Sequence, residues 1–227
     1  MPKLKLLEVM PDIVAGYGLG KMEHHRLCVM AMCAVEDRLR HGESIGELTD
    51  QCECVSPVLR TLAIEVNDCR WYNERSRTKW ALETVPKLLD TNDEKHDWRR
   101  LKAVIKHLVH EIVVPHLMVF KYPEFADELS KSPTLEVCVS IRRQFVELSF
   151  RSMYDSKKHE EVMHWMHIFQ AMESLHSHLH YRKYVIDTVV SVVTNLATML
   201  STQPNDSVRV HKAGKVEALF NVALTTP

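Results

Sequence analysis

The sequence is poor in glycine. Its 227 residues include 6 Gly, whereas average usage of about 7% would give roughly sixteen. Five of the six lie between Gly16 and Gly46, and only Gly214 follows them. Folds built on tight turns or phosphate-binding loops need glycine along the whole chain. The shortage therefore argues against a β-sandwich, a P-loop fold and a dinucleotide-binding fold.

An excess of charge of either sign is also missing, because 29 Lys+Arg against 30 Asp+Glu leave a formal net charge of -1. A nucleic-acid-binding surface usually shows as a clear positive excess, so nucleic acid is the partner that the composition supports least. The longest apolar stretch, residues 184–200, is interrupted by polar residues and is too short to span a bilayer, so no membrane contact is expected. Six cysteines without an apolar signal segment indicate reduced thiols and a cytoplasmic protein.

What the sequence does contain is apolar residues at helical spacing along most of its length. This pattern predicts an all-α protein, a single domain over residues 1–227 that forms an irregular bundle of about seven helices with little or no strand. Residues 1–20 are expected to be a lead-in segment. Residues 203–227 are expected to be a C-terminal tail with a short extended piece over 207–211 and a short helix over 215–223.

Capping residues and prolines place the helix boundaries. Ser56 suits an N-cap and Pro57 the first helical position, and this helix should end near residues 67–68. Pro115 should kink a long helix near residue 114. The remaining helices are expected over residues 21–40, 73–89, 93–120, 133–154, 156–178 and 180–202.

Two Glu-x-x-His pairs are the first candidate for metal chemistry, Glu161 with His164 and Glu173 with His176. Residues three apart share a helix face, and two such pairs hold the metals of di-iron bundles. Here the pairs are twelve residues apart, about 18 Å along one helix, so they cannot share one dimetal centre. A solvated or partner-facing histidine stripe is the favoured interpretation, and no cofactor is expected. Zinc, iron or manganese on these residues is the alternative.

A second candidate region follows the glycines, where Glu23, His24 and His25 open a predicted helix. Further on, Cys52 and Cys54 are separated by one residue, whereas a structural zinc site usually has two residues between paired cysteines. A metal knuckle would form there if His24 or His25 folded back onto the loop. The aromatic and basic residues between Trp71 and Trp80 could stack nucleic-acid bases, although a partly buried tryptophan anchor is the preferred interpretation.

The run of residues 49–68 resembles a segment that recurs in uncharacterised bacterial and bacteriophage proteins. That segment reads Thr/Ser-Asp-x-Pro-x-Cys-Val-x-Pro-Val-Leu and later Asn-Asp, and the polar or turn positions that match it here are Asp50, Cys54, Pro57, Asn67 and Asp68. The chain departs from the pattern at Cys52, where proline is usual, and this weakens a Cys52–Cys54 metal pair. The resemblance implies a bacterial or phage setting, with the host cytoplasm as the location, and no particular reaction.

Together these features predict a protein-interaction or self-assembling helical protein, whose partner is another protein or a second copy of the chain. No complete catalytic motif is present, which favours a non-enzymatic role. A helical metal-dependent hydrolase or oxidase and a nucleic-acid-binding module are the alternatives. The candidate binding residues are Glu23, His24, His25, Asp50, Cys54, Asn67 and Asp68.

Overall fold

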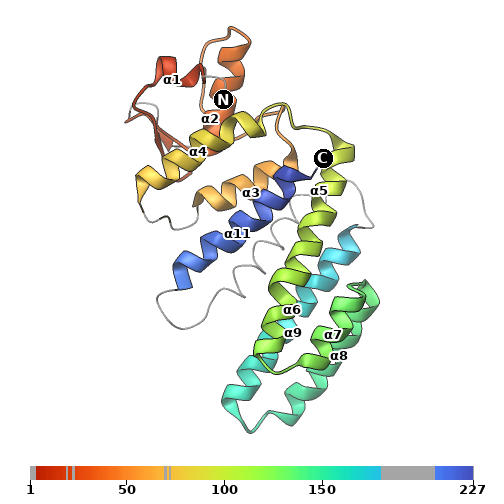
Figure 1. Cartoon of the computed structure of the whole chain (residues 1–227). Coiled ribbons are helices and arrows are strands. Elements are labelled where there is room, and N and C mark those ends of the chain that lie inside the picture. Colours follow the sequence, from red (N-terminus) through yellow and green to blue (C-terminus); the bar gives the residue numbers. More distant parts are fainter. Residues whose placement is uncertain are drawn as a thin grey trace. The chain divides into compact units, whose positions relative to one another are not determined.

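The computed structural model describes residues 4–18, 20–21, 24–68, 71, 73–179 and 208–226, with the backbone only for 174–179 and 208–215. The chain divides into two compact units. The first unit comprises residues 1–104 and 201–227, and the second unit comprises residues 105–200. Figure 1 shows the chain coloured along its sequence. The single domain over residues 1–227 stays a prediction, because one domain can contain two compact units.

The N-terminal segment of the first unit is folded. A short helix, α1 (Leu6–Val9), precedes three two-residue strands, β1 (Val14–Ala15), β2 (Gly20–Lys21) and β3 (Arg26–Leu27). The central strand β3 pairs in parallel with β1 and antiparallel with β2. The strands come close at Gly20, where φ is +84° and an added Cβ would lie 1.9 Å from the Arg26 carbonyl oxygen. Only glycine fits there, which explains one member of the glycine cluster.

The helix expected over residues 21–40 begins later than predicted, as α2 (Val29–Arg40). Cys28 is its N-cap, with extended backbone and a side-chain sulfur that accepts a hydrogen bond from the Ala31 N–H at 3.3 Å. The backbone before it is committed to β2, to the positive φ of His25 and to β3. The prediction of a helix was therefore wrong for the residues before Val29. Apolar residues on both sides of Cys28 are buried, so the hydrophobic pattern alone does not show where the helix begins.

Three more helices of the first unit begin at capping residues. Ser56 caps α3 (Pro57–Asp68), as predicted, with its Oγ accepting from the Leu59 N–H at 3.3 Å. Asn73 caps α4 (Glu74–Leu88) at 2.7 Å, and Pro86 stays inside that helix. Asp93 accepts from the Lys95 N–H at 2.8 Å where α5 (Glu94–His107) begins.

The last helix of the first unit, α11 (Val208–Thr225), packs along α3, as α2 packs against α4 (Figure 1). Residues 208–211 are therefore helical, and the extended piece expected there is wrong. Trp80 contacts Phe220 of α11 edge-on, with ring centroids 5.9 Å apart. Trp80 also contacts Trp71 at 5.4 Å, and the Trp71 Nε1–H donates to the Val66 carbonyl. These half-buried tryptophans thus act as packing anchors of the first unit.

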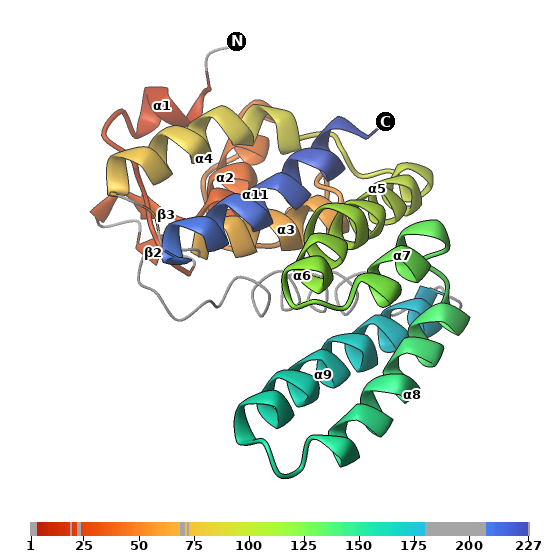
Figure 2. The ribbon, with the colours of Figure 1, turned by 60° about the horizontal axis from the view of Figure 1, so that its bottom comes forward.

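The second unit continues from α5 through a π-helical turn, η2 (Leu108–Val113), into α6 (Val114–Val119), α7 (Pro123–Lys131), α8 (Leu135–Arg151) and α9 (Ser156–Leu179). The π-helical turn lies directly before Pro115, where the sequence predicts a kink. Helices α8 and α9 form an antiparallel hairpin (Figure 2). The core of the second unit contains a cluster of aromatic rings from α7, α8, α9 and the residue before α7, namely Tyr122, Phe125, Phe145, Trp165 and Phe169. The helix expected over residues 180–202 lies outside the described residues.

The all-α prediction is confirmed, with two refinements. A small sheet is present, and the described residues contain more helices than the seven expected, because short ones such as α1 and α6 carry too little periodicity to be recognised. Among the described residues, no helix is both long and apolar enough to cross a membrane.

Candidate functional site

Asn67, one of the predicted binding residues, lies at the centre of the first unit. It is fully buried, and its Nδ2 donates to the Gly16 carbonyl at 2.9 Å and to Asp68 Oδ1 at 2.8 Å. Its Oδ1 accepts from the Val29 N–H at 3.4 Å. One amide therefore joins the end of β1, the first turn of α2 and the last turn of α3. These bonds use both the donor and the acceptor side of Asn67, which makes it an internal brace.

Asp50 and Asp68 act on one thiol, although they flank α3 in the sequence. Burial raises the pKa of the Cys28 thiol, the N–H groups of Ala31 and Met30 oppose that rise, and the carboxylates of Asp50 and Asp68 add to it. Both carboxylates are therefore within electrostatic range of the first turn of α2.

The histidines behind the glycines have a partner of their own. His24 is exposed, and His25 has φ +47°. The His25 Nδ1 lies 2.6 Å from Asp12 Oδ1, and this hydrogen bond lowers the pKa of Asp12. Glu23 lies outside the described residues. The imidazole of His25 is therefore held by Asp12, away from the expected knuckle with the cysteine loop.

A carboxylate that the sequence analysis did not single out lies beside Cys52 and Cys54. The two sulfur atoms are 3.2 Å apart, and a carboxylate oxygen of Asp37 lies with them in a group whose ligand atoms are all within 4.8 Å of one another. Asp37 is on the last turns of α2, whereas both cysteines are in the loop before α3. The order of residues gave no signal for this meeting, because it depends on how the loop folds back onto α2.

Burial governs the protonation of these thiols. It raises the pKa of Cys52 to about 12, and the adjacent Cys54 contributes to the rise. Burial also raises the pKa of Cys54, against the opposing effect of the Asp90 N–H, which hydrogen-bonds the sulfur and favours its thiolate. Both groups are therefore neutral thiols at neutral pH unless a cation replaces their protons.

The Glu-x-x-His pairs of α9 have other partners in the second unit. Glu173 pairs with Arg142 of α8, with Nε and Oε1 2.5 Å apart. Burial and a hydrogen bond to Glu161 raise the pKa of Tyr122. His164 is half-buried against the ring of Trp165, and the side chain of His176 lies outside the described residues. Both glutamates thus stabilise packing, and metal binding at these pairs stays a prediction.

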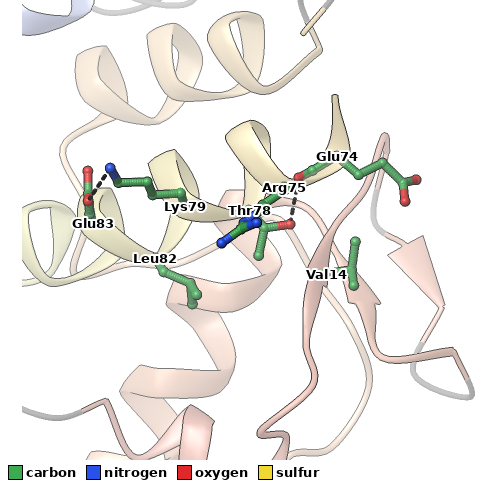
Figure 3. A pocket seen from close by; sticks show the side chains of 7 residues that line it. All are labelled: Val14, Glu74, Arg75, Thr78, Lys79, Leu82 and Glu83. Atoms are coloured by element: carbon green, nitrogen blue, oxygen red, sulfur yellow. Dashed lines mark hydrogen bonds and ion pairs between the residues drawn. The ribbon is translucent and has the colours of Figure 1, made fainter. Parts of the chain in front are cut away.

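A pocket of about 700 Å³ lies beside β1 and α4, and none of the predicted site residues lines it. Figure 3 shows its polar lining on α4, with Val14 and Leu82 supplying apolar surface. Glu74 pairs with Arg26, and Lys79 Nζ lies 3.9 Å from Glu83 Oε1. The lining carries two cations, Arg75 and Lys79, and two anions, Glu74 and Glu83, so it has no net charge.

The turn between α8 and α9 exposes large apolar side chains. Phe150 is 69% exposed, Met153 59% and Tyr154 98%. They fall within five consecutive residues, where α8 ends and the chain reverses into α9. We call these three residues the hairpin tip. Three large apolar side chains exposed within one short segment make the hairpin tip a candidate interaction site.

Comparison with protein-family models, curated proteins and solved structures gives no match to this chain.

Proposed function

We propose that the protein acts by protein association through the hairpin tip, and that the partner is a second copy of the chain. The observation that carries this proposal is the exposure of Phe150, Met153 and Tyr154 within five consecutive residues at the end of a helical hairpin. Aromatic and methionine side chains are enriched where protein surfaces meet. The proposal agrees with the interaction or self-assembling role that the sequence analysis favours.

The charges around the tip favour a second copy. Residues 147–160 carry three cations and three anions, and all six are exposed, namely Glu147, Arg151, Asp155, Lys157, Lys158 and Glu160. A two-fold interface brings the same patch of both copies together. Because this patch has no net charge, two copies can meet without net repulsion and can exchange ion pairs at the rim.

Sedimentation analysis of the full chain at about 1–100 μM tests the proposal. We expect the wild type to approach the mass of two chains, and the Phe150→Ser/Tyr154→Ser variant to remain one chain. Val9→Ser is the matched control, because Val9 is 50% exposed on α1 and lies away from the tip in the sequence. Circular dichroism checks that each variant is folded. A wild type that stays monomeric throughout, or a tip variant that still dimerises, would refute the proposal.

The setting is part of the same proposal. The resemblance of residues 49–68 to bacterial and bacteriophage proteins supports a protein that assembles in the bacterial cytoplasm, of bacterial or phage origin.

A further inference from the structure

The group formed by Asp37, Cys52 and Cys54 has no role in association through the hairpin tip, which belongs to the other unit. Its three ligand atoms come from two segments, α2 and the loop before α3. All lie within 4.8 Å of one another. In a tetrahedral zinc site with Zn–S bonds near 2.3 Å, neighbouring ligand atoms are about 3.8 Å apart. The observed group is therefore already close to the required size.

A tight turn brings the sulfur atoms of Cys52 and Cys54 close together although only one residue separates the two cysteines. The Val55 N–H donates to the Cys52 carbonyl at 3.1 Å, so residues 52–55 reverse direction and both thiols fall on the same side. In an extended segment, residues two apart would also share a side but their sulfur atoms would lie farther apart. The turn thus replaces the two-residue gap of the usual zinc pairs.

The loop is held in this shape from outside. Asn92, which precedes α5, donates its backbone N–H to the Cys54 carbonyl at 3.0 Å and its side-chain Nδ2 to the Glu53 carbonyl at 2.7 Å. Ser56, directly after the loop, is bonded to Thr91 and Asp97. The two cysteines are therefore positioned before any ion binds, which lowers the ordering cost of binding.

The neighbours of the group suit a bound cation. The Asp90 N–H hydrogen-bonds the Cys54 sulfur and favours its thiolate form. His41 Nδ1 hydrogen-bonds the Asp37 backbone carbonyl at 2.9 Å and lies 3.7 Å from Asp37 Oδ1, so an imidazole stands beside that carboxylate. Cys52 is buried, whereas Cys54 and Asp37 are half-buried, so an ion could enter from the solvent side.

We propose that Asp37, Cys52 and Cys54 bind one zinc ion, with the fourth coordination position open to water. Two sulfur ligands and one carboxylate favour zinc over calcium and magnesium, which take oxygen ligands only. In the binding step, Zn²⁺ forms two Zn–S bonds and one Zn–O bond. Each of the two thiols releases its proton to solvent, and Asp37 enters as the carboxylate. One ion therefore displaces two protons.

Elemental analysis of the full chain tests the site. The reduced protein is stripped with a chelator, loaded with zinc chloride and desalted. We expect one zinc per chain in the wild type and none in Cys54→Ser. We also expect the zinc affinity, measured against a chromophoric chelator, to fall at least about tenfold in Asp37→Asn. Two protons per zinc should appear in a weakly buffered solution with a pH indicator.

Matched thiol controls separate the site from general thiol binding. Cys28→Ser keeps its capping role, because serine is a preferred N-cap, and Cys138→Ser removes a buried thiol of the second unit. Both should retain one zinc per chain. Cobalt adds a readout of fold and ligand together, since sulfur-to-metal charge-transfer absorption should appear in the wild type and in both controls and vanish in Cys54→Ser. Sub-stoichiometric zinc in the wild type, unchanged binding in Cys54→Ser, or equal loss in Cys28→Ser would overturn the proposal.

Discussion

Ser56 joins the cysteine loop to the rest of the first unit, and we expect its replacement by alanine to be costly. Its side chain is fully buried. The hydroxyl caps α3 by accepting from the Leu59 N–H and donates its proton to Asp97 Oδ1. Asp97 is itself 2% exposed and also forms an ion pair with Arg100, whose Nη1 lies 3.1 Å from the same oxygen. Ser56→Ala removes both roles of the hydroxyl in one step.

The two losses can be estimated separately. Loss of a serine N-cap costs about 0.5–2 kcal/mol, and a hydrogen bond to a charged group is worth about 1.5–3 kcal/mol. Arg100 remains beside Asp97, so the carboxylate keeps a partner and the larger penalty of an unpaired buried charge is avoided. We therefore expect the free energy of unfolding of the first unit to fall by about 2–5 kcal/mol.

Urea denaturation of the full chain, followed by circular dichroism, measures this loss as a lower midpoint with an unchanged slope. Because the two units need not unfold together, amide exchange within α3 and α5 identifies the affected part. Ser76→Ala is the control, because Ser76 donates only its backbone N–H to the Asn73 cap and the substitution leaves that bond intact. This variant should change the free energy of unfolding by less than about 0.5 kcal/mol.

A double-mutant cycle decides whether the reasoning is correct. Ser56→Ala and Asp97→Asn act on the same hydrogen bond, so their combined effect should fall short of the sum by about 0.5–3 kcal/mol. Additive effects, or a Ser56→Ala variant as stable as the wild type, would refute the linked network. Faster exchange confined to the second unit would also contradict it.

Two further predictions concern one histidine and one glycine. Burial lowers the pKa of His164 below 6.5, helped by His167 and His116, so the unfolded chain takes up the proton first as the pH falls. Stability should then decline below pH 6.5, and His164→Gln should reduce the difference between thermal midpoints at about pH 7.5 and 5.5. Gly20→Ala should cost about 3 kcal/mol or more, because its Cβ would meet the Arg26 carbonyl at 1.9 Å. Gly18→Ala faces open space and should cost about 1–2 kcal/mol; equal thermal midpoints for the two variants would contradict the close approach at Gly20.

Local chemistry made part of this fold predictable from the sequence. The Ser56–Pro57 pair marks the start of α3 because capping and the fixed φ of proline act within a few residues. Pro115 likewise marks the disturbed helix, since the ring removes a hydrogen bond whatever surrounds it. Helices α8 and α9 follow from signals of this kind, whereas α7 (Pro123–Lys131) was not among the predicted helices.

Non-local pairing explains what the sequence did not reveal. Leu27 belongs to β3 and pairs with Ala15, whereas Val29 begins α2. Their side chains are equally buried, so hydrophobic periodicity cannot separate the strand from the helix. The boundary depends on the partner strand and on the sulfur cap at Cys28, and neither is visible in a window of neighbouring residues.

The candidate site shows the same limit. Cys54 was identified from its spacing and from a resemblance, but its carboxylate partner, Asp37, is seventeen positions earlier on another element. The histidines that precede α2 seemed the natural partners because they are nitrogen ligands, yet His25 is committed to Asp12.

The packing of α11 against α3 has a consequence for the order in which the protein assembles. During synthesis, the residues of α3 leave the ribosome long before those of α11, and the entire second unit emerges between them. The second unit is contiguous and can fold as soon as it is complete. The first unit must wait with one face of α3 uncovered until the last helix arrives. During this period of synthesis the second unit can already be folded while the first unit is still incomplete. The uncovered face of α3 is then the surface that a chaperone would shield.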